Sequence, residues 1–496
     1  AIRKVSGLCR RQKNRHIYFY NLLLKIELYE KSGKLINSKK LCDIGLTKLT
    51  KDDSPILKGN FLNHIGTYYF LSENLDHALA YYQKSLDIYR DVKNIRQQGR
   101  AYFTIASVQY QNGDFINAEN SMLKSLTLFE DINDIEGIAL TLGNLGSLYI
   151  EDLKFEKAYE ALTRCESLFR SMNNIAGLIT VMANLGFIQM SSGCYRRAIS
   201  YYQEAEKLSL NSNDVRFTVS TQLELAQVYT AIGHLAKAET TIISALKKLE
   251  NSNTAFNLAD LLNFQDYIQL MQCNLSNISS TDLMFSSNSK VQSGGLMPNK
   301  NINQLLLRLI LGNFADLKDL ESKFPHVNCL GDLYFIETYL SGLTKNESLV
   351  LKCLEHIENQ SGWDKSAYDA IHTIIISYMN QKPLSDLLVI PENPCDGWPF
   401  DVFLFSHFWA GVLVNESPVT RKHLASYVSF AEREGIRFRL VNALRKLAEV
   451  EKEAGEKDTS NLSFSRADEV ALWIWEHAGV FKRQIEQSIP YRKYNS

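Results

Sequence analysis

The chain has 496 residues, of which 45% are hydrophobic and 22% are charged, and its net charge is −1. These values are typical of a soluble globular protein, and a charge this close to zero provides no overall field that would favour nucleic acid or an anionic membrane. No run of 18 apolar residues occurs, so we expect no membrane-spanning helix. The eight cysteines form no CxxC pair, which favours reduced thiols and a cytoplasmic location.

Residues 1–16 form a basic N-terminal segment that contains Arg10, Arg11, Lys13 and Arg15. Such a cluster could contact phosphate groups, but isolated charge clusters are commonly solvated. We therefore interpret the segment as a solvated tail, or as a linker from a domain outside this chain.

A pattern that recurs every 40 residues runs through residues 17–256. Its first column consists of small residues inside a helical pattern: Gly66, Ala106, Gly146, Gly186 and Ala226. Twelve residues later stands a column of alanines: Ala78, Ala118, Ala158, Ala198 and Ala238. The apolar residues around both columns have helical spacing. We therefore predict six repeats of two antiparallel helices, which approach closely where the small residues cross.

Turn and capping residues keep the same 40-residue register. Glycines fall between the two columns in several repeats: Gly33, Gly113, Gly193 and Gly233. A further column has the short polar side chains that favour the N-cap of a helix: Asn94, Asp134, Asn174 and Asp214. These positions predict where one helix ends and the next begins.

The order of leucine, a small residue and tyrosine on the first helix, with alanine on the second, resembles the tetratricopeptide repeat. The usual unit has about 34 residues, whereas this one has 40. Longer units are similar to those of the kinesin light chains, the G-protein-signalling-modulator adaptors and the Rap-type regulators, and the pattern does not choose among them. The resemblance implies an all-α solenoid, a right-handed superhelix whose concave groove is lined by the first helices, and binding rather than catalysis.

The resemblance also implies which side chains face the groove. One column, two residues before the small residues, consists of His64, Thr104, Asn144, Asn184 and Glu224. A carboxamide carries a donor and an acceptor side by side, so Asn144 and Asn184 could pair with the main chain of an extended peptide. Further candidates for contact with a partner are Asn63, Arg100, Phe103, Ser107, Tyr110, Ser147, Phe187, Met190 and Gln227.

A structural interpretation of the same residues stays open. Asn144 and Asn184 could be solvated, or could bridge adjacent repeats, because polar residues on the open face of a helix need no special role. The aromatic candidates could belong to the core, where aromatic side chains contribute much of the packing energy.

The second half of the chain differs in composition. Residues 257–303 predict a helix followed by a linker rich in Ser and Asn, and residues 304–496 predict a divergent helical domain. Within that domain, Leu447, Ala448 and Gly455 partly match the repeat, and the partner helix, SRADEVALWIWEHAGVF, is expected only after an insertion. Three prolines and a glycine between residues 390 and 405 preclude a continuous helix there.

We find none of the phosphate-loop, nucleophile-elbow or zinc-protease motifs, and the ten histidines are scattered. We therefore expect no enzyme, no cofactor and no metal. The first functional hypothesis is a scaffold or adaptor that binds a peptide segment of a partner protein in the groove. The alternative is a ligand- or peptide-responsive regulatory part of a signalling protein or transcription regulator. An enzyme hidden in residues 304–496 is the least favoured hypothesis.

Overall fold

The computed structural model describes residues 15–212, 214–252, 258–274, 303, 306, 309, 329–340, 346–360, 363–381, 384, 388–391, 398–413 and 417–477. Most of the basic N-terminal segment and of the predicted linker therefore lies outside the described residues. Contacts divide the chain into two compact units, residues 1–184 and 185–496, and each is described by itself. None of the described helices is long and apolar enough to cross a membrane.

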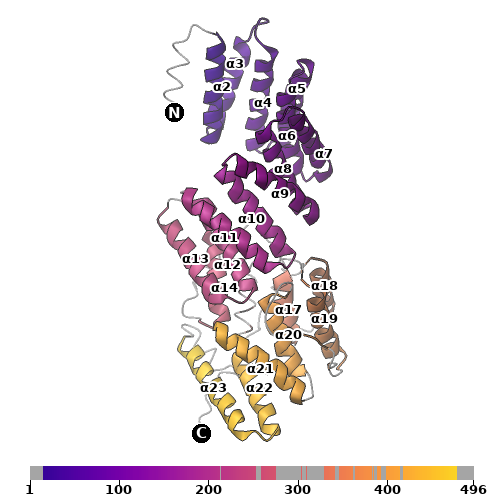
Figure 1. Cartoon of the computed structure of the whole chain (residues 1–496), viewed down its shortest axis with the longest axis vertical. Helices are drawn as coiled ribbons and strands as arrows, with labels where there is room; N and C mark the ends of the chain where they lie inside the picture. Colours follow the sequence, from indigo (N-terminus) through magenta and orange to yellow (C-terminus); the bar gives the residue numbers. More distant parts are fainter. Residues whose placement is uncertain are drawn as a thin grey trace. The chain divides into compact units, whose positions relative to one another are not determined.

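Unit 1 consists of helices that pack in antiparallel pairs (Figure 1). The helices are α2 (Arg15–Lys31), α3 (Leu35–Lys48), α4 (Pro55–Leu71), α5 (Leu75–Asp91), α6 (Ile95–Gln111), α7 (Phe115–Asp131), α8 (Ile135–Glu151) and α9 (Phe155–Ser171). Helix α10 (Ile175–Ser191) begins in unit 1 and ends in unit 2. The predicted all-α solenoid of helical hairpins is confirmed.

The helix ends follow the predicted register. The N-cap side chains of Asn94, Asp134, Asn174 and Asp214 accept hydrogen bonds from backbone N–H groups two or three residues later, at 2.9–3.2 Å. At the turn between α6 and α7, Gly113 has a φ of +77°, and Asp114 N–H donates to the Gln109 carbonyl. This is the Schellman arrangement, in which a left-handed residue closes the end of a helix. The predicted caps are therefore confirmed.

The two helices of a hairpin approach closely because glycine receives a large side chain. A Cβ at Gly146 of α8 would lie 2.5 Å from Leu162 of α9. Gly66 meets Tyr82 and Gly186 meets Tyr202 in the same way, sixteen residues further along the chain in each case. Ala158 is fully buried, but the residue that occupies the space beside Gly146 is Leu162. In each of these close contacts, a glycine of the first helix therefore packs against a large side chain of the second helix.

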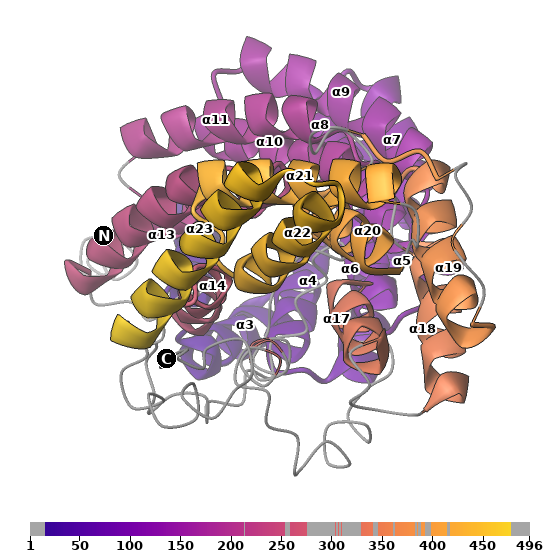
Figure 2. The same cartoon turned by 90° about the horizontal axis from the view of Figure 1, so that it is seen from below.

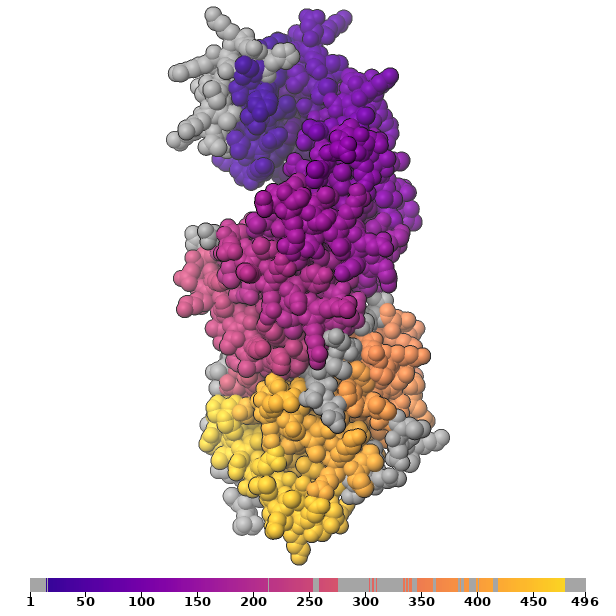
Figure 3. Space-filling model, viewed as in Figure 1, coloured from indigo at the N-terminus to yellow at the C-terminus, as the bar shows by residue number. Residues whose placement is uncertain are grey.

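A second set of glycines joins neighbouring hairpins, and the sequence pattern did not reveal it. Phe129 of α7 lies between Gly99 of α6 and Gly137 of α8, where added Cβ atoms would lie 2.9 and 2.6 Å from its ring. Phe169 of α9 contacts Gly177 of α10 similarly. In the space-filling view, side chains cover the helices of unit 1 on the face that is shown (Figure 3).

Unit 2 contains two further groups of helices. The first is α11 (Tyr195–Ser212), α12 (Val215–Ala231), α13 (Leu235–Glu250) and α14 (Leu258–Met271). The second is α17 (Cys329–Leu340), α18 (Glu347–Gln360), α19 (Lys365–Met379), α20 (Phe400–Leu413), α21 (Ser417–Glu434), α22 (Leu440–Glu453) and α23 (Lys457–Glu476). Figure 2 shows α21, α22 and α23 side by side, as their contacts require.

The C-terminal helices pack directly on the end of the repeat pattern. Phe430 of α21 lies against Gly233, in the turn between α12 and α13. The backbone N–H groups of Arg437 and Phe438 donate to the Met271 carbonyl of α14, at 3.0 and 3.2 Å. Unit 2 as defined by its contacts begins at residue 185, and the predicted limits at 257–303 and 304–496 remain predictions.

One prediction in this half is wrong. Helix α23 begins at Lys457, directly after the turn at Gly455, so no insertion precedes it. Glu456 N–H donates to the Glu451 carbonyl at 2.9 Å, as in the turns of the first half. The residues KDTSNLSF, which look irregular in the sequence, are helical because Ser460 and Ser463 donate back to α22, to the Ala448 carbonyl and the Glu451 carboxylate.

The segment before α20 agrees with the prediction. No continuous helix connects α19 to α20 in the residues that the structure describes, and α20 begins only at Phe400. Trp398 is buried, and its indole N–H donates to Ser366 at 3.0 Å. This tryptophan therefore packs the segment against α19.

The core of unit 2 contains buried polar groups. Both Tyr267 of α14 and Tyr334 of α17 donate to Asp401 Oδ1 of α20, at 2.6 and 2.7 Å. Glu337 accepts from Arg439 Nε at 3.1 Å. Tyr334, Glu337, Asp401 and Arg439 line a cavity of about 20 Å³, which is large enough for a single water molecule. Burial raises the pKa of Asp401 to about 7, although both phenols oppose the shift.

We predict that Gly146→Ala destabilises the protein, whereas Gly143→Ala on the same helix does not. A Cβ at Gly146 would overlap Leu162, which costs about 1–3 kcal/mol. A Cβ at Gly143 meets only the Cys165 sulfur, at 3.4 Å, and alanine favours a helix by about 1 kcal/mol over glycine. Urea unfolding of the two variants measures both effects, and a shift in the same direction for both would contradict the packing argument.

We predict that Asp401→Asn removes part of the pH dependence of stability. Because folding raises the pKa of this carboxyl from 3.8 to about 7, its contribution is complete below pH 3.8 and is lost as pH rises through 7. The melting temperature of Asp401→Asn relative to the parent should therefore rise between pH 5 and pH 8. The exposed Asp369→Asn variant is the control, and it should show no such trend.

Candidate functional site

The candidate site is the open side of the first helices in unit 1. We call it the first-helix face and define it by Arg100, Thr104 and Ser107 of α6, Leu140, Asn144 and Ser147 of α8, and Asn184 of α10. These side chains are exposed or half-buried. Contacts connect α2 with α4 and α6 with α8, so consecutive first helices are neighbours.

Two members of the predicted groove column connect successive hairpins. His64 Nδ1 of α4 lies 3.1 Å from both carboxylate oxygens of Glu30 in α2. Ser38 of α3 also donates to Glu30, at 3.0 Å. Asn184 Nδ2 of α10 donates to Ser147 Oγ of α8 at 3.2 Å. Asn184 therefore has the bridging role that the sequence left open for the two asparagines, and His64 connects hairpins as well, which was not predicted.

The other two members of the column in unit 1, Thr104 and Asn144, form hydrogen bonds within their own helices. Asn144 is exposed, and its Nδ2 donates to the Leu140 carbonyl at 2.9 Å. Thr104 Oγ1 donates to the Ala101 carbonyl at 3.0 Å. Asn144 and Asn184 thus have different surroundings: the first can exchange its local bond for one with a ligand, and the second is already engaged.

The remaining candidates of unit 1 differ in exposure. Arg100 is exposed, whereas Asn63, Phe103, Ser107, Tyr110 and Ser147 are half-buried. Ser107 and Ser147 donate to the carbonyls of Phe103 and Gly143, four residues back. Burial, and then Glu151 of α8, raise the pKa of the Tyr110 phenol to about 12, so Tyr110 stays neutral. Asn63 Oδ1 is covered and has no hydrogen-bond partner in the described part of the chain.

The candidates of unit 2 are more enclosed. Met190 and Gln227 are buried, with exposed fractions of 3% and 4%, so neither is accessible to a partner in this structure. Phe187 and Glu224 are half-buried. Burial raises the pKa of Glu224 to about 7, and a hydrogen bond with Ser220 partly opposes this shift.

One residue of the first-helix face, Leu140, is not among the residues predicted from the sequence. Leu140 is 44% exposed and lies one helical turn before Asn144. It stands 40 residues after Arg100 and so belongs to the same column, of which only Arg100 was selected as a candidate. Its position, one repeat after the candidate Arg100, could have indicated it from the sequence.

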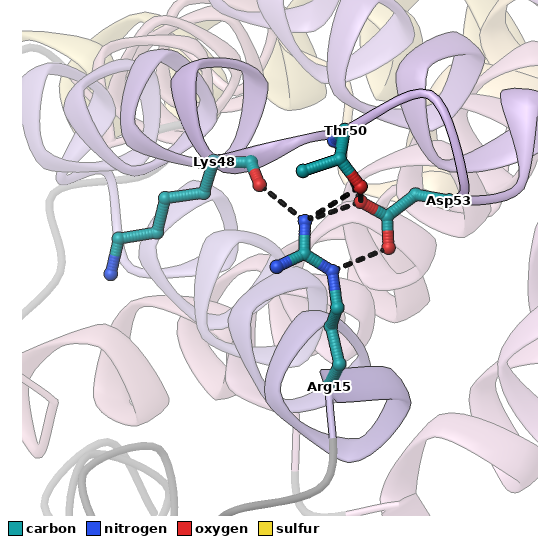
Figure 4. Close-up of polar contacts among 4 residues, drawn as sticks. All are labelled: Arg15, Lys48, Thr50 and Asp53. Atoms are coloured by element: carbon teal, nitrogen blue, oxygen red, sulfur yellow. Dashed lines mark hydrogen bonds and ion pairs between the residues drawn. The ribbon is translucent and has the colours of Figure 1, made fainter.

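Arg15 belongs to the first helix rather than to a free tail. It is the first residue of α2. Its guanidinium forms a bidentate ion pair with Asp53, which lies in the turn before α4 (Figure 4). The same guanidinium donates to the Lys48 carbonyl and to Thr50. Arg15 and backbone Thr50 hold the pKa of Asp53 well below its usual range. This arginine is therefore engaged within the fold.

The described His, Cys, Asp and Glu side chains form no cluster that resembles a metal site. No group of three or more His, Cys, Asp or Glu side chains in the described part could hold a metal ion. His407 and His423 are buried side by side, with their Nδ1 atoms 3.1 Å apart, and His407 Nε2 lies 3.0 Å from the Pro391 carbonyl. Burial lowers the pKa of both imidazoles, that of His407 to about 4, so they stay neutral at physiological pH.

Residues 57–131 match the family model for the tetratricopeptide repeat. Among solved structures, a Rap protein complexed with competence and sporulation factor is 12% identical over 96% of this chain and 98% of its own, with a TM-score of 0.39. The apo form of the quorum sensor NprR from B. thuringiensis is 17% identical over 76% of this chain and 92% of its own, with a TM-score of 0.42.

Kinesin light chain TPR-like repeats from Podosopora anserina are 13% identical over 40% of this chain and 99% of their own, with a TM-score of 0.35. Comparison with curated proteins gives no significant match. The family model covers α4 to α7 and thus two consecutive hairpins of the 40-residue register. The chain therefore carries tetratricopeptide repeats.

Proposed function

We propose that the chain is a non-enzymatic scaffold or adaptor, and that the first-helix face of unit 1 holds an extended peptide segment of a partner protein. The observation that supports this most directly is Asn144, an exposed carboxamide in the middle of that face. Its donor is bonded only to a carbonyl of its own helix, and such a bond is easily exchanged.

The surroundings of Asn144 suit a main-chain ligand. Ser147, one turn after Asn144, is half-buried and carries a hydroxyl on the same face of α8. Leu140 offers an exposed apolar surface one turn away, and Arg100 offers a charge on the neighbouring α6. A carboxamide beside a small residue pairs with any peptide backbone, while the apolar and charged neighbours select among side chains.

In this proposal Asn144 pairs with the main chain of the peptide, whereas Asn184 does not. Asn184 is bonded to Ser147, so its amide group is shared between α10 and α8. Met190 and Gln227 are buried and do not belong to the proposed contact surface. The proposed surface is therefore centred on α6 and α8.

We predict that Asn144→Ala weakens partner binding about tenfold without a change in melting temperature, since a ligand bond of about 1.4 kcal/mol is lost. The parent chain is used to isolate the partner from the native cell, and mass spectrometry identifies it. Calorimetry with the purified partner then gives the affinities. Asn120→Ala, an exposed asparagine on the second helix α7, is the matched control and should bind as the parent does.

Unaltered affinity of Asn144→Ala would remove the main-chain pairing from the proposal. The double variant Asn144→Ala/Asn184→Ala should be less stable than the single variant, because it also loses the bond from Asn184 to Ser147. Its affinity is therefore compared at a temperature where both variants are fully folded.

We predict that Leu140→Asp abolishes recovery of the same partner while the fold is retained. The side chain is 44% exposed, so an aspartate there stays solvated, but it would place a charge where the ligand's apolar groups are expected. Leu123→Asp on α7, where the leucine is 42% exposed, is the matched control. Equal recovery with both variants would move the binding surface away from α8.

A further inference from the structure

We infer that the peptide on the first-helix face presents an acidic side chain to Arg100 of α6 and, about three residues away, an apolar side chain to Leu140 of α8. This inference rests on the proposed function, because it assumes that the chain binds an extended peptide. It adds the chemistry of two ligand residues and the spacing between them.

Arg100 differs from the other arginines of unit 1 that the structure describes. Each of the others has a carboxylate at ion-pair distance: Arg15 has Asp53, Arg90 has Asp87, Arg96 has Asp134, Arg164 has Glu130 and Arg170 has Glu166. Arg100 is exposed and forms no ion pair or hydrogen bond within the described part of the chain. Its guanidinium donors are therefore available, and a carboxylate is the group that can accept two of them at once.

Carboxylates of the other first helices leave this charge without a partner. Glu30 of α2 is bonded to His64 of α4. Glu136, at the start of α8, stands in the register of Arg96 and thus one helical turn before the register of Arg100. The face therefore presents an unopposed positive charge, which an acidic group of a ligand would complement.

The column that contains Arg100 continues over consecutive first helices as Tyr20, Asn60, Arg100 and Leu140. Asn60 is used within the fold, because it accepts a hydrogen bond from the Tyr89 hydroxyl at 2.8 Å. Tyr20 and Leu140 are 63% and 44% exposed. Accessible side chains thus occur on both sides of Arg100, which favours a peptide that crosses the face over one that ends there. We therefore assign the carboxylate to a side chain and not to the C-terminus of the ligand.

The spacing follows from the packing of α6 and α8. Contacts connect these two helices, and the axes of packed helices lie about 8–10 Å apart. A peptide in the polyproline-II conformation returns to the same face every three residues, after about 9 Å. Side chains three residues apart would therefore meet Arg100 and Leu140, which occupy the same position in consecutive repeats. This conformation has no internal hydrogen bonds, so the main chain of the ligand stays available to Asn144.

The first experiment uses pools of labelled nine-residue peptides, which are acetylated and amidated so that no terminal carboxylate is present. Two positions three residues apart carry glutamate and leucine in either order, and the remaining positions are random and uncharged. Matched pools replace the glutamate with glutamine or lysine, or place the leucine directly beside the glutamate. Fluorescence anisotropy with the full chain should show about fivefold tighter binding of the glutamate pool than of the glutamine pool, as for an exposed ion pair.

Variants of Arg100 test whether this residue reads the charge. Arg100→Gln should bind the glutamate and glutamine pools alike. Arg100→Glu should prefer the lysine pool to the glutamate pool, and a merely structural arginine would not produce such a reversal. Arg96→Gln is the matched control, since Arg96 is an exposed arginine of the same helix that is paired with Asp134 at 2.9 Å. This control should keep the preference of the parent.

The outcomes separate the inference from the proposed function. Equal binding of the glutamate and glutamine pools to the parent, or a preference that survives in Arg100→Gln, overturns the acidic contact and leaves the scaffold proposal intact. Equal binding of the two leucine spacings overturns the three-residue spacing. A preference seen only with a free C-terminal carboxylate overturns the assignment to a side chain. Binding of no pool overturns the inference, while the partner isolated from the native cell decides the proposed function separately.

The second experiment measures the melting temperature of Arg100→Gln. It should equal that of the parent, because the guanidinium has no partner in the described part of the fold. A fall of more than about 2 °C would show that Arg100 is engaged inside the protein and would overturn the inference.

Discussion

The structure depends on large side chains that lie against glycines. Helices of a hairpin approach closely where one of them has a small residue, and at the glycines the space is filled by Leu162 at Gly146 and by Tyr82 at Gly66. Glycine is unfavourable inside a helix, but the burial and dispersion energy of the opposing side chain outweigh that preference. The same principle joins neighbouring hairpins through Phe129 and Phe169.

This packing determines which faces of the helices are buried and which are exposed. In unit 1, the second helices α7 and α9 contribute large side chains such as Phe129 and Leu162 to the interior. The first helices α6 and α8 keep exposed residues such as Arg100 and Asn144. On the exposed face, one column of the repeat serves two purposes. His64 and Asn184 connect consecutive hairpins, whereas Asn144 forms its hydrogen bond within its own helix and stays exposed.

Local features could be predicted from the sequence, and contacts between distant residues could not. The N-caps at Asn94 and Asp134 and the turn at Gly113 depend on a few neighbouring residues, and they were predicted correctly. The partner of Gly146 was not predicted, because small residues were matched with small ones. Tyr267 and Asp401 are brought together over 134 residues, and no periodicity indicates such a pair.

The candidate site shows the same limit. The register placed Asn144 on an exposed face, but it could not show that Asn184 is bonded to Ser147 or that Met190 is buried. The insertion expected before α23 is absent, because Ser460 and Ser463, which precede the expected helix, are helical and donate hydrogen bonds to α22. Burial and hydrogen bonding at these positions depend on the neighbouring hairpin, which a single helix pattern does not contain.

The position of Phe129 between two glycines has a consequence for how such a chain can change in length during evolution. One ring serves two hairpins, so a loss or gain of a few residues between Gly99 and Gly137 would leave the ring facing a residue with a side chain. The loss or duplication of a whole 40-residue unit would instead preserve the register of small and large residues along the array. The spacing of 40 residues is therefore conserved by geometry within the array, independently of what the array binds.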